Sequence, residues 1–442
     1  MRNNTDANAA TLENGSRIAV VGGGPTGSFF TIFALKMAKM IGKELQVTVF
    51  EPKDFTRDGP GGCNRCGGVI SELLVQTLAV EGIILPDSVV QRGINSYRLH
   101  TENGSVTIAT PFSERTIATV YRGIGPKGII GKNKESFDNF LLRLAVQEGA
   151  VHMPVRVDRI EYRNTLPVIF SRGQEIQAYD LVAGTCGVNS SGANLFESLG
   201  FGYNKPELIT AAIAELGMDR ETISEYFGNS IHLFLLPVKD IRFAAMIPKG
   251  TYVTLCILGK NISAQGVDSF LSNSVVKRAL PEKYEINCRC LPKMNVAAPK
   301  TPFADRIVMC GDAGSTRLFK DGIGAAYLMG KAAAKTAVFQ GAGSEHFRQH
   351  YYPCYRSLIL DNYFGKFLYA VTEAYKTNKA LCRGMLRVVR KEQKNPDKPK
   401  RLSTIMWDIF TGNERYKNIF FNSLSPRMNL EIIQEVVKAA VR

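Results

Sequence analysis

A short apolar run that passes directly into a glycine-rich turn and then into a helix is the feature that most constrains this chain. Residues Arg17 to Val21 read RIAVV, the turn reads GGGPTG, and the helical stretch SFFTIFALKMAKMIG follows. Gly22, Gly24 and Gly27 fit the pattern G-x-G-x-x-G. In that pattern the first glycine permits a tight turn, the second lets the backbone approach a pyrophosphate, and the third lets helix pack on strand. The segment predicts the start of a dinucleotide-binding unit.

A second apolar run, from Leu45 to Phe50, ends in an acidic residue at the expected distance. Glu51 lies 24 residues after Gly27, where a carboxylate accepts hydrogen bonds from an adenosine ribose. The amides at the start of the helix would face the phosphates, because the helix dipole favours negative charge there. Dinucleotide binding is the prediction, and a strand-to-helix turn without a ligand is the alternative.

Another strand, turn and small-residue helix follow near residue 300, in DRIVMCGDAGSTRLFKDGIGAAYLMGKAAAKTA. This segment resembles the GD motif of the para-hydroxybenzoate hydroxylase-like flavoproteins. The resemblance implies that Asp312 holds the ribityl chain of FAD and that the helix beginning at Asp321 points its N-terminus at the flavin. A helix N-terminus stabilises the negative charge of a reduced flavin. The cofactor contacts implied here are Gly311, Asp312, Gly322, Ile323 and Gly324.

Two further segments between these motifs carry the same resemblance, each with a departure. A basic residue four positions before an Asp touches the cofactor in this class, which assigns Lys134 with Asp138, although Lys stands where Arg is usual. Lys offers a point charge in place of a planar fork. The segment GTCGVNS resembles the DG motif, but Cys186 replaces the Asp. That Asp is tied to pyridine-nucleotide binding, so direct reduction by NADPH is in doubt while FAD binding is still expected.

The segment after Glu51 indicates a branch of these flavoproteins. Cys66, Gly67 and Gly68 resemble the Cys-Gly-Gly of the geranylgeranyl reductase family, where this segment runs beside the isoalloxazine. Cys66 is the one candidate catalytic residue, as a proton source; the alternative is that small residues are needed for close packing. The family's Tyr-x-Trp-x-Phe-Pro pattern is degraded to FAAMIP at residues 243–248, which predicts a smaller apolar cavity.

These motifs predict an α/β fold: a Rossmann-type FAD-binding domain with an inserted α+β substrate domain and a helical C-terminal region. The FAD-binding domain is assigned to 17–90, 120–200 and 296–343, and the substrate domain to 91–119 and 201–295. Residues 1–16 are expected to be a disordered lead, and 344–442 to be helical.

Charge and cysteine content limit the partners and the compartment. The net charge of +15 favours anionic partners, but no nucleic-acid-binding signature occurs, so nucleic acid is not expected. No signal peptide or spanning run is found, which predicts a cytoplasmic protein, with peripheral membrane contact through the basic helix near 381–390 left open. The cysteine pairs Cys63/Cys66 and Cys288/Cys290 could ligate zinc, but a structural role is favoured and no metal is predicted.

The predicted function is that of an FAD-dependent oxidoreductase, resembling geranylgeranyl reductases, that reduces C=C bonds of an apolar, polyisoprenoid-like or lipid substrate, with NADPH as a possible electron donor. The first alternative is a flavin monooxygenase acting on an apolar substrate. The second is an FAD-binding electron-transfer protein that docks on a membrane or a partner.

Overall fold

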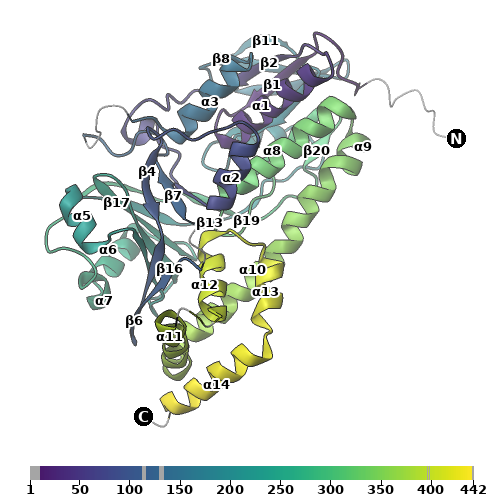
Figure 1. Cartoon of the computed structure of the whole chain (residues 1–442). Coiled ribbons are helices and arrows are strands. Elements are labelled where there is room, and N and C mark those ends of the chain that lie inside the picture. The colour runs from purple at the N-terminus through teal and green to yellow at the C-terminus, as the bar shows by residue number, and fades with distance from the viewer. Residues whose placement is uncertain (1–9, 112–115, 129–133, 396, 398, 441–442) are drawn as a thin grey trace.

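The computed structural model describes residues 10–111, 116–128, 134–395, 397 and 399–440. Figure 1 shows a parallel sheet with its helices at the top, a larger sheet at the lower left and the C-terminal helices at the lower right. Of the predicted disordered lead, residues 1–9 lie outside the described residues. The rest of it is packed, because Leu12 is only 1% exposed in the main apolar core and Gly15 donates to the Glu44 carbonyl.

A six-stranded sheet forms the first layer, in the order β20-β21-β12-β1-β2-β8. All neighbouring pairs are parallel except β20 with β21. In both β1 and β2 the last four residues are buried, which is the pattern of a strand covered on both faces. The strands are β1 (Arg17–Val21), β2 (Gln46–Phe50), β8 (Val151–Met153), β12 (Leu181–Gly184), β20 (Phe303–Ala304) and β21 (Ile307–Met309).

Helices cover one face of this sheet, and a small antiparallel sheet in the order β11-β10-β9 belongs to the same lobe. The helices α1 and α8 pack closely, because Gly330 of α8 leaves no room for a side chain: a Cβ there would lie 3.0 Å from the Phe30 nitrogen. These elements are α1 (Pro25–Met40), α3 (Phe137–Gln147), α8 (Gly322–Phe339), α4 (Gly192–Glu197), β9 (Arg159–Arg163), β10 (Leu166–Ser171) and β11 (Gln174–Ala178).

The second lobe is a seven-stranded sheet in the order β18-β14-β17-β16-β15-β5-β6. Alternate residues of its strands face opposite sides, so Ala212, Ala214 and Leu216 pack in one apolar cluster while Ile213 and Glu215 face a pocket. The elements are β5 (Ser96–Thr101), β6 (Gly104–Ala109), β14 (Ala212–Gly217), β15 (Ser230–Phe234), β16 (Ile241–Pro248), β17 (Tyr252–Gly259), β18 (Glu285–Cys290), α5 (Arg220–Tyr226), α6 (Ala264–Ser272) and α7 (Ser274–Lys277).

Two small sheets, β3-β7-β4 and β13-β19, connect the lobes along the chain. They bring segments that are far apart in sequence next to each other, such as Val69 beside Thr119. Their elements are β3 (Val69–Ile70), α2 (Glu72–Val80), β4 (Val90–Ile94), β7 (Ile117–Val120), β13 (Glu207–Thr210) and β19 (Lys293–Ala297).

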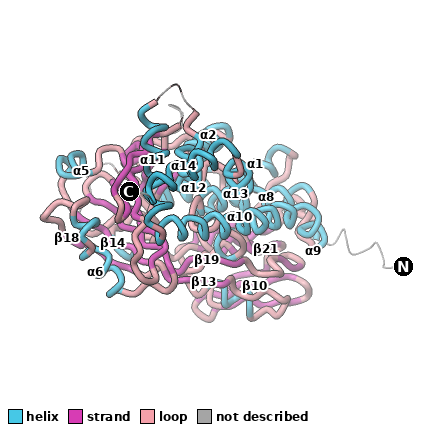
Figure 2. Tube along the Cα trace, turned by 90° about the horizontal axis from the view of Figure 1, so that it is seen from below, coloured by secondary structure: helices cyan, strands magenta, loops and turns pink. Residues whose placement is uncertain are grey.

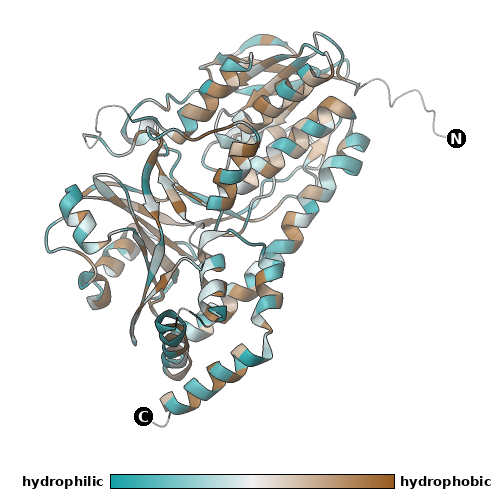
Figure 3. Cartoon of the chain, viewed as in Figure 1, coloured by the Kyte–Doolittle hydropathy of each residue, from teal (hydrophilic) through white to brown (hydrophobic). Residues whose placement is uncertain are grey.

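The C-terminal helices form a layer between the seven-stranded sheet and α8, as Figure 2 shows from below. Figure 3 colours much of α11 as hydrophilic, yet its apolar side, including Met385 and Val389, is buried in the second core. The exposed apolar residues lie instead on other helices, for example Phe367 on α10 and Ile433 on α14. The helices are α9 (Ser344–His346), α10 (Tyr352–Thr377), α11 (Lys379–Lys394), α12 (Arg401–Thr411), α13 (Tyr416–Ser423) and α14 (Pro426–Ala440).

The predicted fold class is confirmed: a Rossmann-type sheet, an inserted α+β lobe and a helical C-terminal region are all present. The predicted strand from Leu45 begins one residue later, at Gln46, and the one from Arg17 has the predicted bounds. None of the described helices has both the length and the apolar composition to cross a membrane.

Candidate functional site

Three segments that follow neighbouring parallel strands meet at one edge of the six-stranded sheet. Gly22 follows β1, Glu51 follows β2 and Thr185 follows β12. The Thr185 hydroxyl donates to the Gly22 carbonyl over 2.7 Å, and the Gly22 amide donates to the Phe50 carbonyl over 2.9 Å. The chain order reverses here, since β1 lies between β2 and β12. Doubly wound sheets bind their ligands at such switch points, beyond the carboxyl ends of the strands.

The structure gives each glycine of the first motif the predicted geometry. Gly22 has φ +112°, which favours glycine, and a Cβ there would lie 2.9 Å from the Cα of Cys186. At Gly24 a Cβ would meet only Asn64 Nδ2, at 3.8 Å, so open space adjoins the backbone. At Gly27 a Cβ would lie 1.9 Å from the Gly22 carbonyl oxygen, so only glycine lets helix and turn approach this closely.

The start of α1 and the side chain of Glu51 complete this edge. The cap of α1 is Gly24, with no side-chain bond to the helix, and no acidic residue occupies its first turn. Such an N-terminus is suited to a phosphate. Glu51 is buried, and its carboxylate accepts from the amides of Gly23 and Lys53, both at 2.9 Å. Burial raises the pKa of Glu51, while those two amides and the nearby Lys53 lower it.

A buried ion pair, which the sequence did not reveal, lies beside the glycine turn. Asp138 is fully buried and pairs with Arg122, at 2.7 and 2.9 Å, and also accepts from Asn64 Nδ2 at 2.7 Å. Asn64 in turn accepts from Lys53 Nζ at 2.9 Å. Lys134, which was predicted to contact the cofactor, lies before α3 and makes no ion pair with the described residues, and its contact with a cofactor stays a prediction.

Cys186 packs against the glycine turn at Gly22. Its Cα underlies Gly22, and a Cβ on Gly192 would lie 2.5 Å from its own Cβ. Burial raises the pKa of the Cys186 thiol to about 12, so the thiol is neutral at pH 7. The site therefore lacks the carboxylate that the DG motif of related flavoproteins would place here.

Hydrogen bonds from two side chains hold the backbone of the GD segment, which precedes α8. Asn295 Nδ2 donates to the carbonyls of Asp312 and Gly314, at 2.9 and 3.0 Å, and the Tyr203 hydroxyl donates to the Ala313 carbonyl at 2.7 Å. Burial raises the pKa of Asp312, and a hydrogen bond from Thr316 opposes that shift. At Gly311 a Cβ would lie 2.2 Å from the Thr26 hydroxyl, so this glycine lets the segment pack on α1.

The first turn of α8 has its own anionic cap, which the sequence did not reveal. The carboxylate of Asp321 accepts a hydrogen bond from the Gly324 amide at 3.2 Å. Of the three cofactor contacts predicted in the first turn of α8, Gly322 and Ile323 are therefore the two whose amides have no acceptor among the described residues. Burial raises the pKa of Asp321 to about 6. Phe319 and Asp321 have φ of +64° and +53°, a conformation that costs energy in residues with side chains.

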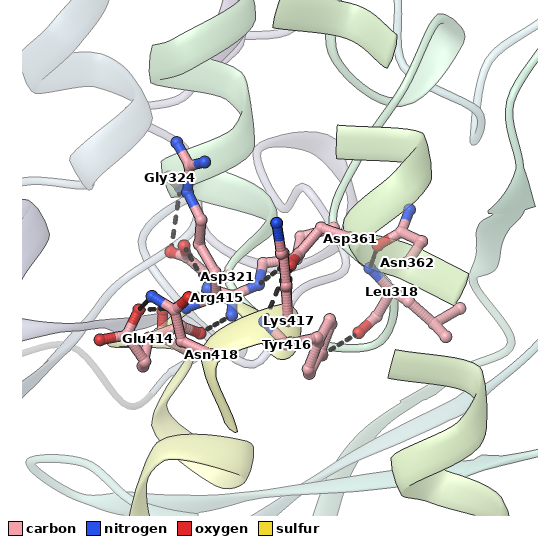
Figure 4. A network of polar contacts seen from close by, with 12 residues as sticks. Leu318, Asp321, Gly324, Asp361, Asn362, Glu414, Arg415, Tyr416, Lys417 and Asn418 are labelled. Carbon is pink, nitrogen blue, oxygen red and sulfur yellow. Dashed lines mark hydrogen bonds and ion pairs between the residues drawn. The ribbon is translucent and has the colours of Figure 1, made fainter. Parts of the chain in front are cut away.

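A polar network anchors this turn to the C-terminal helices, as Figure 4 shows. Arg317 pairs with Asp321 at 3.5 Å and with Asp361 at 3.9 Å, and also donates to the carbonyls of Gly412 and Glu414. The Asp361 carboxylate accepts the amides of Tyr416 and Lys417, at 3.1 and 2.9 Å. The predicted helical region thus fixes the start of α8 and does not merely flank it.

A cavity of about 320 Å³ adjoins this turn and is called here the inner cavity. Its wall is mostly apolar and aromatic, with the Lys320 side chain and the Asp321 side chain as its charged groups. Burial lowers the pKa of Lys320 to about 8. Ala245 and Ile247 come from the degraded FAAMIP segment, which confirms an apolar wall there. The lining residues are Val69, Tyr97, Ile231, Ala245, Ile247, Lys320, Asp321, Phe410 and Thr411.

Cys66, Gly67 and Gly68 lie between the inner cavity and a second one. A Cβ at Gly67 would lie 2.9 Å from Ile247 Cδ1 and 3.1 Å from Cys256 Sγ. Lys249 is buried beneath this segment and donates to the carbonyls of Gly67, Gly68 and Val120, at 2.8, 3.1 and 2.8 Å. Close packing, the alternative considered for these glycines, is therefore present.

The second cavity, of about 450 Å³, brings together the two cysteine pairs. Cys63 and Cys66 come from the loop, and Cys288 and Cys290 from the same face of β18. No group of three or more His, Cys, Asp or Glu among the described residues is arranged to hold a metal ion. Glu215, opposite Cys288 in the sheet, also lines this cavity; burial raises its pKa to about 7. Cys66 faces this cavity, and its role as a proton source stays a prediction.

Arg122, Lys249, Glu215 and Lys320 were missed by sequence reasoning. No local pattern marks the first three, since each becomes buried only when distant strands meet. The run FKDG does contain a signal for Lys320, which is a charged residue directly before the N-cap of an apolar helix.

Comparisons with known proteins support the fold. No family model matches the chain, and no curated protein does. Among solved structures, the halogenase PltM, in complex with ethyl mercury and mercury, has a TM-score of 0.64 at 11% identity, covering 96% of this chain and 95% of its own. A flavoprotein/dehydrogenase from Cytophaga hutchinsonii has a TM-score of 0.60 at 16% identity, covering 90% and 92%.

A monooxygenase shares the same fold. The p-nitrophenol 4-monooxygenase PnpA from Pseudomonas putida has a TM-score of 0.55 at 12% identity, covering 85% of this chain and 98% of its own. At such identities the likeness establishes the architecture of these flavoproteins and leaves the chemistry to be argued from the site.

Proposed function

We propose that this protein is an FAD-dependent oxidoreductase that acts on a small apolar molecule held in the inner cavity. The observation that carries the proposal is the open space beside Gly24 at the switch point of the sheet, with the free N-terminus of α1 behind it. The shared architecture with flavoproteins supports FAD over other dinucleotides.

The residues present fit this cofactor. The backbone from Gly24 to Gly27 would take the pyrophosphate, Glu51 has lone pairs left for a ribose hydroxyl, and Asp312 would hold the ribityl chain. FAD supplies two-electron transfer when bound. The amides of Gly322 and Ile323 would then stabilise negative charge on the flavin, because they begin a helix of 18 residues.

The inner cavity fits the substrate. It adjoins the start of α8, and its wall combines mostly apolar and aromatic side chains with two charged groups, which is the usual lining of a small-molecule pocket. Reduction of a C=C bond, inferred from the Cys66-Gly67-Gly68 resemblance, is the reaction we propose first. The small volume favours a compact substrate over a long polyisoprenoid chain.

A monooxygenase acting on an apolar substrate is the second candidate. The compact cavity with Tyr97 and Phe410 in its wall favours it, since these rings suit a single aromatic ring. Anaerobic reduction with dithionite separates the two. Reoxidation by an added alkene lipid, giving a saturated product, supports the reductase, whereas reoxidation only after oxygen is admitted, with an oxygenated product, supports the monooxygenase.

The substitution Gly24→Ala tests the cofactor site. The backbone there has φ −66°, which alanine adopts freely, and the new methyl group meets only Asn64 Nδ2 at 3.8 Å. We expect the free energy of unfolding without cofactor to change by less than about 0.5 kcal/mol. FAD affinity, measured by quenching of flavin fluorescence, should fall at least about tenfold, because the methyl occupies the space next to the phosphates.

Gly93→Ala is the matched control, because nothing lies within 4 Å of a Cβ there and the position is remote from the turn. It should bind FAD as the unmodified protein does. Absence of FAD binding by the unmodified protein, or equal affinity in both variants, would contradict the proposal.

Two earlier predictions stay open beside it. Reduction by NADPH is tested by the same anaerobic experiment with NADPH in place of dithionite. Peripheral membrane contact would involve the exposed apolar residues of α10, α13 and α14 in place of α11, whose apolar side is buried.

A further inference from the structure

The ammonium group of Lys320 lies in the inner cavity against two aromatic rings. Its Nζ is 5.1 Å from the centre of the Phe243 ring and 5.8 Å from that of Phe410. No carboxylate of the described residues forms an ion pair with it. The neighbouring Asp321 is already engaged by Arg317 and by the amide of Gly324. A cation held in an apolar cavity without a counterion is costly unless a ligand supplies the charge.

The backbone holds Lys320 in this place against a local cost. Phe319 and Asp321, on either side of it, both have left-handed φ values. A left-handed φ costs conformational energy in a residue with a side chain, and strain of this kind persists where surrounding structure imposes it. The Arg317 network and the Asn362 side chain, which accepts the Leu318 amide at 2.9 Å, impose it here.

From this geometry we propose that the inner cavity binds a substrate with a compact apolar or aromatic body and one carboxylate, and that Lys320 pairs with that carboxylate. The inference deepens the proposed function by naming the substrate class. Among the described residues that line the cavity, Lys320 is the one cation, which suits a monoanion, whereas a phosphate dianion would need further positive charge. The aromatic rings of Tyr97 and Phe410 would contact the body of the molecule.

The protein carries its own reporter for this binding. Trp407 is the only tryptophan of the chain, and it is fully buried. Its ring packs edge-on against Tyr97, with centroids 5.2 Å apart, and Tyr97 lines the inner cavity. Tryptophan fluorescence therefore reports occupancy of the cavity in the protein with or without FAD.

The test compares trans-cinnamate with its neutral amide, cinnamamide, by Trp407 fluorescence at pH 7. We expect cinnamate to bind at least about tenfold more tightly, since hydrogen bonds to charged groups contribute about 1.5–3 kcal/mol. Lys320→Met should remove that preference and leave cinnamamide affinity within about threefold. Lys320→Arg should retain it. Circular dichroism of the variants establishes that they are folded.

The pH dependence gives a second measurement. Binding of cinnamate needs the protonated amine, so its affinity should fall as pH rises above about 8, the pKa to which burial lowers Lys320, and cinnamamide affinity should not. The other titratable groups facing Lys320 are Cys256, Tyr97 and Asp321. None of them changes charge near pH 8, because burial raises the pKa of Cys256 and Tyr97 well above that pH, and that of Asp321 only to about 6.

Two results would overturn the proposal. One is equal affinity for cinnamate and cinnamamide, or a preference that survives in Lys320→Met. The other is trapping of cinnamaldehyde on Lys320 by borohydride without any preference for cinnamate, since the lysine would then act as an amine nucleophile. The inference rests on the proposed function, but the two fail separately: failure of FAD binding would refute the proposed function, whereas the fluorescence signal, which does not require FAD, tests the pairing of a carboxylate with Lys320.

Discussion

Replacing Arg122 with methionine should destabilise the protein strongly, because it leaves a buried carboxylate without its cation. Asp138 is fully buried and Arg122 is 9% exposed, and their two hydrogen bonds measure 2.7 and 2.9 Å. After the change, Asn64 would be the one side chain still donating to Asp138. Breaking a buried pair from one side costs about 3–5 kcal/mol. We expect the free energy of unfolding, from urea denaturation followed by far-UV circular dichroism, to fall by that amount.

The double variant Arg122→Met with Asp138→Leu separates the pair from its surroundings. Removing both charges avoids the isolated carboxylate, so the double variant should recover most of the lost stability, as replacing a buried pair by apolar residues is often neutral. Arg163→Met is the matched control, since Arg163 and Glu175 pair at 2.6 Å with side chains 53% and 45% exposed. Its cost should stay below about 1 kcal/mol.

A loss below about 1 kcal/mol in Arg122→Met would refute this reasoning. A double variant as unstable as the single one would also refute it, because the cost would then come from lost packing and not from the unpaired charge.

Three further predictions rest on single features. Gly68→Ala should destabilise the protein by more than about 1 kcal/mol in urea denaturation, because Gly68 has φ +63° and a Cβ there would lie 2.3 Å from the Val120 oxygen. Gly61→Ala should not, because nothing lies within 4 Å of a Cβ at Gly61. Burial lowers the pKa of His100 to about 4 and that of His232 to about 3. The free energy of unfolding should therefore decrease as pH falls below about 6.5, where the histidines of the unfolded chain gain protons. The decrease from pH 7 to 5 should be smaller in His232→Phe, and an equal decrease would contradict this. Because burial raises the pKa of Cys63 and Cys288, and that of Cys290 to about 12, these thiols should react with iodoacetamide at pH 7 more slowly than free cysteine, as mass spectrometry of alkylated peptides would show.

The parts of the site that sequence could predict are those encoded in neighbouring residues. The turn from Gly22 to Gly27 and the acid at Glu51 have a fixed spacing, so strand, turn and helix were predicted with their roles. Gly311 and Asp312 were recognisable for the same reason, since a short strand precedes them and a helix follows.

The parts that sequence could not predict depend on distant segments. The spacing that singled out Lys134 and Asp138 gave no sign that Asp138 pairs with Arg122, which lies two residues after β7. The Asp321 cap of Gly324 depends on an αL conformation that contacts of Arg317 and Asn362 help to hold. The meeting of both cysteine pairs at one cavity also depends on distant segments, and among the described residues no group of His, Cys, Asp or Glu there is arranged to hold a metal ion.

The three carbonyl bonds of Lys249 limit how the two lobes can move. Lys249 follows β16 of the larger sheet, and it holds Gly67, Gly68 and Val120 of the other segments at one buried point. A hinge motion that opened the lobes at this edge would break these hydrogen bonds and leave the ammonium group and the three carbonyls buried without partners. The two lobes should therefore behave as one rigid body at this edge.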